Sequence, residues 1–381
     1  MMSIRCANCK RSYPEVGAAE KCPICGGFYE ILEWPLREAP ERINPSMGIW
    51  NYLHPEAFGA SAEVISLGEG LTPLVWSSVG DKDRRPVEVC FKCEHFNPTG
   101  SFKDRGSAAC VQFLVNRGID TVYEDSSGNA GASLAAYASR AGLEAHIYVP
   151  SSVSGAKRAQ ISQFGAQLHL VEGPRSRVTE ALYRDLRGKS IASIVYASHA
   201  WMPFHLIGYA TLALELFDQL GGAPGSILLP VGQGGLLLGV ASGFEWLRMR
   251  GKIEVMPQIY GVQARACAPL WAVYSYGRAG LSWVVEGETL AEGIRIKYPI
   301  RGDAVLEAVE KSGGSFFAVD EEEIIEGMKT ATQMGFLVEP TSAVVFPVLL
   351  NYVEIMRQPV VVILSGSGYK ALEQYEAQSS H

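Results

Sequence analysis

The sequence has few features of a membrane, secreted or nucleic-acid-binding protein. Its 381 residues hold 33 Lys and Arg against 40 Asp and Glu, a net charge of −7. This balance argues against nucleic acid or an anionic membrane as the main partner. No basic region followed by an apolar core opens the chain, so we expect no secretory signal and a cytoplasmic location. Residues 226–244 lack charge, but a proline and several glycines interrupt them, which excludes a membrane span.

The eight cysteines show no disulfide-like arrangement. Four of them form two C-x2-C pairs separated by twelve residues: Cys6, Cys9, Cys22 and Cys25. Four thiolates from two tight turns suit tetrahedral Zn and leave no open coordination position, so residues 1–33 predict a small domain with structural Zn. The two halves resemble a rubredoxin-like zinc ribbon. Cys90 and Cys93 form a third C-x2-C, but they lie in an alternating segment and are predicted to be buried in a strand.

From about residue 86, short β-branched runs alternate with helical segments. Glycines follow the predicted helices, for example Gly118 after a helix that runs to about Asn116, and Gly142 after the helix 130–141. Strands that alternate with helices predict an α/β fold with mainly parallel sheets covered on both faces. Such sheets bind ligands at the loops that leave the carboxyl ends of their strands.

One lysine lies in an unusual setting, FKCEHFNPTGSFKDRG, residues 91–106. The turn at Pro98 and Gly100, with Thr99 or Ser101 as a cap, predicts that Lys103 lies in the first turn of a helix. The positive end of the helix dipole disfavours a second positive charge there, so a neutral and nucleophilic amine is easier to reach. A solvated lysine at a helix start is the alternative for this fragment taken alone.

Three loops that follow predicted strands could hold a ligand. The segment SSGNAG, residues 126–131, offers hydroxyls, an amide and main-chain N–H groups for a carboxylate. PVGQGGLLLG, residues 230–239, offers main-chain amides as a phosphate cradle, although it is neither a Walker loop nor a GxGxxG fingerprint. LSGSG, residues 364–368, ends a buried strand with hydroxyls. A reactive lysine together with these loops provides the parts that hold pyridoxal phosphate, whose lysine forms a Schiff base and whose ring stores electrons.

With these segments and VEPTSA, residues 338–343, the chain resembles the fold-type II pyridoxal-phosphate enzymes, and among them the threonine synthases. The resemblance covers essentially the whole chain. It implies two mainly parallel α/β domains with the cofactor between them, in addition to the ribbon. On this basis we expect a larger domain of residues 34–104 and 206–381, a smaller domain of residues 105–205, and a homodimer.

The resemblance also implies residue roles. Lys103 would be the Schiff-base lysine and proton shuttle, Asn129 would bond the ring hydroxyl, and Ser365 would face the pyridine nitrogen. The phosphate would lie on the amides of the glycine loop: Gly232, Gln233, Gly234, Gly235 and Leu236. The substrate would be received by the first loop: Ser126, Ser127 and Ala130. A neutral serine at the ring nitrogen leaves it unprotonated, which suits elimination and replacement on an amino-acid side chain.

The chain departs from the threonine synthase pattern where a phosphorylated substrate would bind. Ala130, His205 and Leu236 stand where we expect Thr, Arg and Asn, and residues 366–368 read Gly-Ser-Gly rather than Gly-His-Gly. The leading expectation is a threonine synthase-like lyase acting on O-phosphohomoserine. The alternatives are dehydration of threonine or serine, β-replacement on an unphosphorylated amino acid, and a non-catalytic scaffold. Arg265, Arg295 or Lys297 could replace the missing cation, and His199 and His205 are interpreted as structural.

Overall fold

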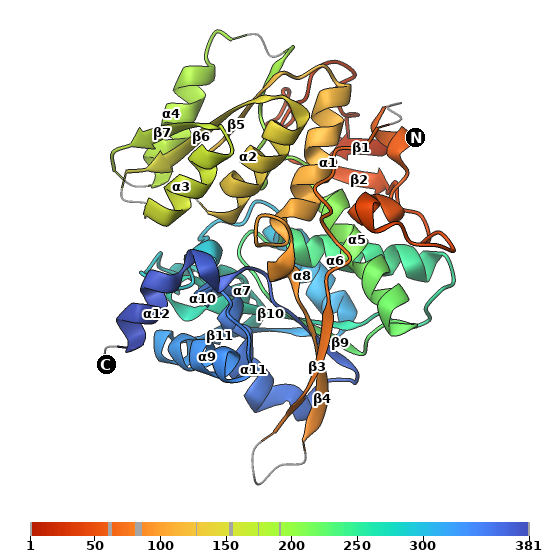
Figure 1. The fold of residues 1–381 in the computed structure, drawn as a ribbon, viewed down its shortest axis with the longest axis vertical. Coiled ribbons are helices and arrows are strands. Elements are labelled where there is room, and N and C mark those ends of the chain that lie inside the picture. Colours follow the sequence, from red (N-terminus) through yellow and green to blue (C-terminus); the bar gives the residue numbers. More distant parts are fainter. Residues whose placement is uncertain are drawn as a thin grey trace. The chain divides into compact units, whose positions relative to one another are not determined.

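The computed structural model describes residues 2–59, 63–80, 86–126, 128–151, 155–173, 175–189 and 192–379. The chain forms two compact units (Figure 1). Unit 1 comprises Met1–Leu71, Asn97–Thr99 and Lys103–Thr211, and unit 2 comprises Thr72–Phe96, Gly100–Phe102 and Leu212–His381. The limits 1–33, 34–104 with 206–381, and 105–205 expected from the sequence group the residues differently and stay a prediction.

Unit 1 is built on a four-stranded parallel sheet in the order β7-β6-β5-β8. Its strands are β5 (Thr121–Glu124), β6 (Glu144–Pro150), β7 (Gln167–Val171) and β8 (Ile194–Tyr196). Its helices are α1 (Lys103–Asn116), α2 (Asn129–Ala141), α3 (Gly155–Gln163), α4 (Arg175–Leu186) and the first half of α5 (Phe204–Leu220). All four residues of β5 are buried, as expected of a central strand with helices on both faces.

The N-terminal ribbon belongs to unit 1. Strands β1 (Ser3–Cys6) and β2 (Tyr29–Glu33) pair antiparallel, and two 3-10 helices, η1 (Pro45–Asn51) and η2 (Pro55–Phe58), follow. Tyr13 attaches the ribbon to the helices of this unit, because its ring lies 5.8 Å from that of Phe113 on α1 and 5.4 Å from that of Phe204 on α5. Edge-to-face aromatic contacts of this kind stabilise beyond the area they bury.

Unit 2 is built on a six-stranded sheet in the order β11-β10-β9-β12-β4-β3. Its strands are β3 (Leu74–Val79), β4 (Val87–Lys92), β9 (Ser226–Pro230), β10 (Gln258–Ala264), β11 (Ser315–Val319) and β12 (Val360–Ile363). Only the β3–β4 pair is antiparallel. The helices of eight or more residues are α6 (Gly235–Met249), α7 (Pro269–Tyr276), α8 (Gly302–Ser312), α9 (Glu321–Gln333), α11 (Val345–Tyr352) and α12 (Leu372–Ser379).

Several expectations from the sequence are confirmed. The sheets are mainly parallel, α1 ends at Asn116 with Gly118 at φ +72°, and α2 ends at Ala141 with Gly142 at φ +72°. Cys90 and Cys93 are both fully buried, Cys90 within β4 as predicted and Cys93 directly after its last residue. The apolar segment before β12 is divided into α10 (Pro340–Ala343), α11 and η7 (Val353–Ile355). Pro347 has no N–H to donate to the carbonyl four residues earlier, which explains the first break.

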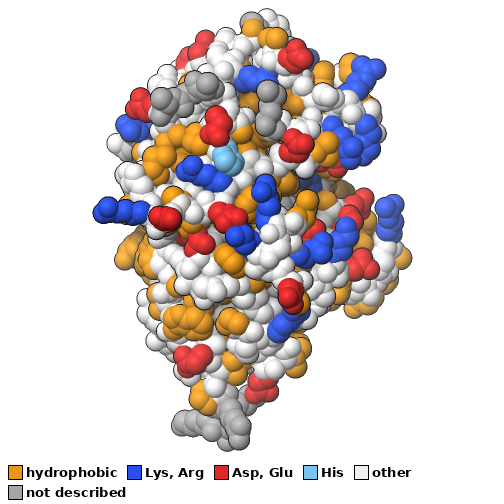
Figure 2. All heavy atoms as spheres, turned by 90° about the vertical axis from the view of Figure 1, so that its right-hand side faces the viewer, with side chains coloured by type: hydrophobic (Ala, Val, Ile, Leu, Met, Phe, Trp, Pro, Cys, Tyr) orange, Lys and Arg blue, Asp and Glu red, His pale blue; other side chains and the backbone are white. Residues whose placement is uncertain are grey.

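Charged side chains are spread over the face of the molecule that Figure 2 shows. On the face drawn in Figure 2, acidic and basic side chains are interspersed among hydrophobic ones. None of the helices in the described part of the chain combines the length and hydropathy that a bilayer crossing needs.

Candidate active site

Lys103 is the first residue of α1, as the sequence predicts. The turn before the helix is closed by a carboxylate, because Asp104 accepts hydrogen bonds from the Thr99 N–H at 2.7 Å and the Thr99 hydroxyl at 2.6 Å. Ser101 is buried and its hydroxyl has no partner among the described residues. The cap expected from Ser101 is therefore not formed, and an aspartate side chain fixes the position of the lysine instead.

The helices that carry Lys103 and Tyr209 approach closely. A Cβ on Gly106 of α1 would lie 2.6 Å from the Tyr209 ring, and a Cβ on Gly208 of α5 would lie 1.9 Å from the Arg105 carbonyl. Only glycine fits at either position. The Tyr209 ring centroid lies 6.0 Å from the Lys103 Nζ. One aromatic face is thus held next to the amine expected to carry the cofactor.

The loop after β5 forms the start of α2, where the sequence predicts a carboxylate site. Ser126 is buried, Asn129 and Ala130 open the helix, and a Cβ on Gly131 would lie only 1.9 Å from the Ser126 carbonyl. Gly131 therefore permits a turn tight enough to direct the first amides of a 13-residue helix at a ligand. Ser127, also expected here, lies outside the described residues.

Two buried carboxylates lie behind this loop, and the sequence interpretation did not include them. Asp125 accepts a hydrogen bond from the Tyr196 hydroxyl at 2.7 Å and another from Thr179. Glu124 accepts from the backbone N–H of His199 at 3.1 Å and contacts the His199 Nδ1 at 3.2 Å. The signal in the sequence was the acidic pair that ends a strand otherwise made of buried residue types.

The glycine loop of unit 2 lies between β9 and α6, as expected. Gly234 is the N-cap of the 15-residue helix α6 and has φ +81°, a conformation that L side chains avoid. A Cβ there would lie 2.3 Å from the Val305 Cγ2, and a Cβ on Gly232 would lie 3.0 Å from the Ile294 Cα. The Gln233 side chain accepts from the Ile300 N–H at 3.1 Å. The loop therefore presents main-chain amides, with no room for side chains, at a helix start that suits a phosphate.

Ser365 follows β12 and is held rigidly. Its N–H donates to the Ser342 hydroxyl at 2.9 Å, its carbonyl accepts from the Phe102 N–H at 3.1 Å, and Lys103 is the next residue of the chain after Phe102. The Ser365 hydroxyl is buried and has no partner among the described residues. Because buried hydroxyls are normally hydrogen-bonded, this atom fits a ligand acceptor such as a pyridine nitrogen, and the residues present fit pyridoxal phosphate.

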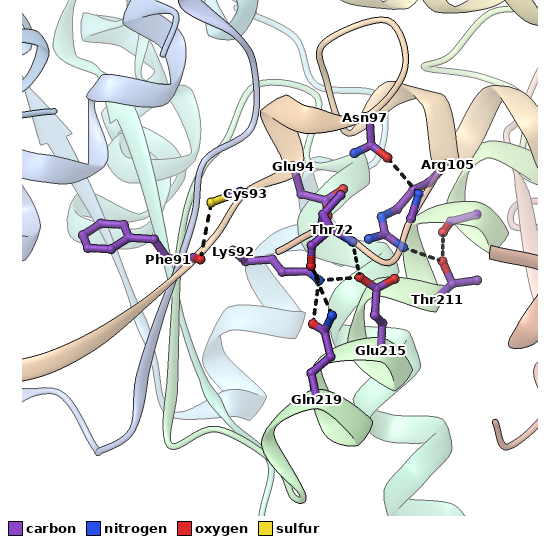
Figure 3. Close-up of polar contacts among 12 residues, drawn as sticks. Thr72, Phe91, Lys92, Cys93, Glu94, Asn97, Arg105, Thr211, Glu215 and Gln219 are labelled. Carbon is purple, nitrogen blue, oxygen red and sulfur yellow. Dashed lines mark hydrogen bonds and ion pairs between the residues drawn. The ribbon is translucent and has the colours of Figure 1, made fainter. Parts of the chain in front are cut away.

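A buried ion pair supports the same edge of the unit 2 sheet (Figure 3). Lys92, the last residue of β4, contacts Glu215 on α5 and donates to the Thr72 carbonyl and the Gln219 side chain, both at 2.7 Å. The Thr72 hydroxyl in turn donates to Glu94 at 2.6 Å. Lys92 also pairs with Ile363 of β12, two residues before Ser365. Removing one partner of such a pair typically costs about 3–5 kcal/mol, since a buried charge is left alone.

The four ribbon cysteines meet as predicted. Their sulfur atoms all lie within 4.8 Å of one another, and Cys6 and Cys25 are 3.5 Å apart, Cys9 and Cys22 3.6 Å apart. Backbone N–H groups of Ile24 and Cys25 lower the pKa of the Cys22 thiol to about 6, which favours the thiolate that a metal binds. The geometry is that of a closed four-thiolate site, which suits a structural metal.

Comparison with known proteins shows the family to which the chain belongs. Residues 65–366 match the model of the family described as pyridoxal-phosphate dependent enzyme. The chain is 32% identical to a threonine synthase of Methanocaldococcus jannaschii, over 96% of this chain and 92% of that protein. It is 33% identical to a threonine synthase of Synechocystis sp., over 81% of this chain and 78% of that protein.

Solved structures show the same fold. A threonine deaminase of T.th. aligns with a TM-score of 0.62 and 26% identity, over 78% of this chain and 92% of that one. Maize serine racemase aligns with a TM-score of 0.65 and 21% identity, over 80% of this chain and 93% of that one. The expected fold and the expected enzyme class, a pyridoxal-phosphate-dependent lyase, are confirmed. The chain belongs to the family of pyridoxal-phosphate-dependent enzymes.

Proposed function

We propose that this enzyme eliminates or replaces an oxygen substituent on the side chain of an amino acid. The observation that carries the proposal is similarity to a threonine synthase along nearly the whole chain, at 32% identity. The first candidate reaction is accordingly conversion of O-phosphohomoserine to threonine and phosphate. Bound pyridoxal phosphate would supply an electron sink for the carbanion at Cα.

The chain's residues have the following proposed roles. Lys103 holds the cofactor as a Schiff base and moves the Cα proton. Asn129 bonds the ring hydroxyl, and Ser365, with its unpartnered hydroxyl, faces the ring nitrogen. The cofactor phosphate lies on the amides of Gly232, Gln233, Gly234, Gly235 and Leu236. The substrate is received at the start of α2 by Ser126, Ser127 and Ala130.

A second candidate reaction is dehydration or β-replacement on an unphosphorylated substrate. Ala130 and Leu236 are buried apolar residues where phosphate partners are expected. His205 is also buried, and its Nε2 lies 3.3 Å from the Ala197 carbonyl. Each missing charge-assisted hydrogen bond is worth about 1.5–3 kcal/mol. The loss of two such bonds together would change the ratio of kcat/KM between a phosphorylated and an unphosphorylated substrate by roughly two to four powers of ten.

Steady-state kinetics decide between these candidates. The kcat/KM for O-phosphohomoserine is to be compared with the values for L-homoserine, L-threonine and L-serine. Turnover of O-phosphohomoserine alone supports the threonine synthase reaction and implies that another cation, such as Arg295, has taken over the phosphate. Comparable or better turnover of a hydroxy amino acid supports the second candidate. A purified protein that stays colourless with added cofactor would favour a non-catalytic scaffold.

We also propose that Cys6, Cys9, Cys22 and Cys25 hold one structural Zn, as their sulfur cluster suggests. Metal analysis of the purified chain should give about one Zn per chain. Serine at all four positions should abolish metal binding while cofactor absorbance remains. Metal content that survives these substitutions would contradict the assignment. We further propose a cytoplasmic homodimer, which size-exclusion chromatography with light scattering tests.

A further inference from the structure

His199 and Glu124 form an acid–base pair at the carboxyl edge of the unit 1 sheet. Glu124 ends β5, and His199 lies three residues after the end of β8, the neighbouring strand. One carboxylate oxygen faces the His199 Nδ1 at 3.2 Å and the other accepts the His199 backbone N–H at 3.1 Å. The Glu124 side chain is 1% exposed and that of His199 is 12% exposed. The carboxylate thus fixes both the ring and the main chain of the histidine.

This geometry assigns different tasks to the two ring nitrogens. Because Nδ1 faces a carboxylate, Nδ1 carries a hydrogen whether the ring is neutral or protonated. Nε2 is then the nitrogen that gains and loses a proton. A histidine oriented in this way by a carboxylate is the usual arrangement for general acid–base catalysis.

The pair lies near the groups proposed to carry the chemistry. Ser126, where the substrate loop begins, is two residues after Glu124. Burial, with the nearby Cys110 and Glu124 as further causes, raises the pKa of the Tyr209 hydroxyl, and the Tyr209 ring lies 6.0 Å from the Lys103 Nζ. The Tyr209 ring is therefore next to the Lys103 amine. Glu124, which affects the Tyr209 hydroxyl, holds His199.

We propose that His199 is the acid that protonates the departing side-chain oxygen, and that Glu124 positions it. The assignment rests on the proposed elimination or replacement function and specifies its substrate class: an amino acid whose hydroxyl must leave as water. A phosphate group leaves without such help, whereas hydroxide does not. The inference therefore favours the unphosphorylated substrate of the second candidate reaction.

With L-serine, the proposed reaction removes the Cα proton and the β-hydroxyl group. The Lys103 amine takes the Cα proton, and the electron pair of that C–H bond forms the carbon–carbon double bond. The bond between Cβ and oxygen breaks, and its electron pair stays with the oxygen. The Nε2 proton of the His199 imidazolium goes to that oxygen, so water departs and a neutral imidazole remains. His199 then regains a proton from solvent.

The test compares two substrates that share a carbon skeleton. The holoenzyme and its His199→Asn variant are assayed with L-serine, which loses hydroxide, and with β-chloro-L-alanine, which loses chloride without a proton. The variant should lower kcat/KM for L-serine by about a hundredfold or more, the usual contribution of a general acid. Its kcat/KM for β-chloro-L-alanine should change less than about threefold. Glu124→Gln should show the same selectivity with a smaller loss, about tenfold.

A surface pair provides the control. His54 Nδ1 lies 2.9 Å from the Glu56 carboxylate, and both side chains are exposed. His54→Asn should leave kcat/KM unchanged for both L-serine and β-chloro-L-alanine. A second readout needs no cofactor: imidazole ¹H–¹⁵N spectra of the apoprotein should show His199 with hydrogen on Nδ1, and Glu124→Gln should remove that preference.

Three outcomes would overturn the inference. Equal loss on both substrates in His199→Asn, or no loss on L-serine, would show that His199 does not protonate the leaving oxygen, and the proposed function would stand. An apoprotein spectrum with hydrogen only on Nε2 would overturn the role of Glu124. A wild-type holoenzyme inactive on both compounds would overturn this inference, and the proposed function would fall with it only if O-phosphohomoserine were not turned over either.

Discussion

The carboxyl edges of the two sheets differ in whether their buried polar side chains have hydrogen-bond partners within the protein. In unit 1, strand β5 ends in the buried carboxylates Glu124 and Asp125, and side chains of the same unit hydrogen-bond to both. In unit 2, the hydroxyls of Ser101 and Ser365 are buried and lack partners among the described residues. Unit 1 therefore has a charged edge whose hydrogen bonds the protein itself makes. Unit 2 also has a buried ion pair at its edge, Lys92 with Glu215, but its loops offer amides and hydroxyls suited to a ligand.

This difference corresponds to two tasks in the proposed function, holding a cofactor in unit 2 and transferring protons in unit 1. A cofactor that must be held in one orientation needs donors and a tight backbone, which glycine loops and a helix start provide. A substrate that changes charge during the reaction needs groups that move protons, the role that we propose for His199, positioned by Glu124, in unit 1. Buried ionisable groups cost free energy unless they are paired. The hydrogen bonds that Asp125 and Glu124 accept within unit 1 offset this cost.

The largest effect on activity is expected from substituting Lys103. This residue directly follows Phe102, whose N–H donates to the Ser365 carbonyl. Lys103→Ala removes both the covalent attachment and the proposed base, so activity should fall by at least about a thousandfold. Borohydride reduction of the wild-type holoenzyme followed by peptide mapping should place the label on Lys103. Lys297→Ala is the control and should keep the label. A label found on Lys92 or Lys297 would refute the role of Lys103.

A second test concerns Glu69, which departs from the pattern of unit 1. This carboxyl is fully buried, and desolvation raises its pKa from 4.5 to about 7, although Tyr137 and the Leu67 N–H donate to one of its oxygens. Its other oxygen has no partner among the described residues. A carboxyl with a raised pKa in the folded state lowers stability as pH rises between the unfolded and folded values.

The free energy of unfolding should therefore fall by about 3 kcal/mol from this group alone between pH 4.5 and 7. Glu69→Gln removes the titration, so relative to wild type it should be little changed at pH 5 and more stable by up to about 3 kcal/mol at pH 8. Urea denaturation at the two pH values measures this. Glu215→Gln is the contrasting variant. It removes the carboxylate that faces the buried Lys92 ammonium, so it should lower the free energy of unfolding at both pH values. A pH-independent difference for Glu69→Gln would contradict the raised pKa.

A third test changes the cradle of unit 2. Gly234→Ala places a Cβ 2.3 Å from the Val305 Cγ2 at a residue with φ +81°. The loop must shift, and cofactor affinity should weaken by about thirtyfold, or about 2 kcal/mol. Cofactor titration followed by absorbance measures it. Gly222→Ala is the control, because a Cβ there meets nothing within 4 Å. Unchanged affinity in Gly234→Ala would show that the cofactor phosphate binds elsewhere.

The sequence predicted what short-range patterns determine. Glycines at positions 118 and 142 marked the ends of α1 and α2 within two residues, and the loops around Lys103, Asn129 and Gly234 were recognisable from residue types alone. Contacts between distant residues were not recognisable. The ion pair of Lys92 with Glu215 joins residues 123 positions apart, and the Glu124–His199 pair joins residues 75 apart. A single sequence gives no signal for which of many charges meet in the fold, and His199 was therefore interpreted as structural.

The smallest expected effect compares one substitution in the two units. Ser133 in unit 1 is buried and its hydroxyl bonds Asp104 at 2.6 Å and Ser107 at 2.7 Å, so Ser133→Ala should destabilise the apoprotein by about 1 kcal/mol. Ser365 in unit 2 is equally buried, but its hydroxyl has no partner among the described residues. Ser365→Ala should leave apoprotein stability unchanged or raise it by up to about 1 kcal/mol, since no hydrogen bond is lost. The same variant should weaken cofactor binding about fivefold, because the ring nitrogen loses its donor.

Urea denaturation of the apoproteins and cofactor titration measure the two effects. Equal destabilisation by both substitutions, with unchanged cofactor affinity in Ser365→Ala, would mean that the Ser365 hydroxyl serves the fold and that the two edges do not differ in the way proposed.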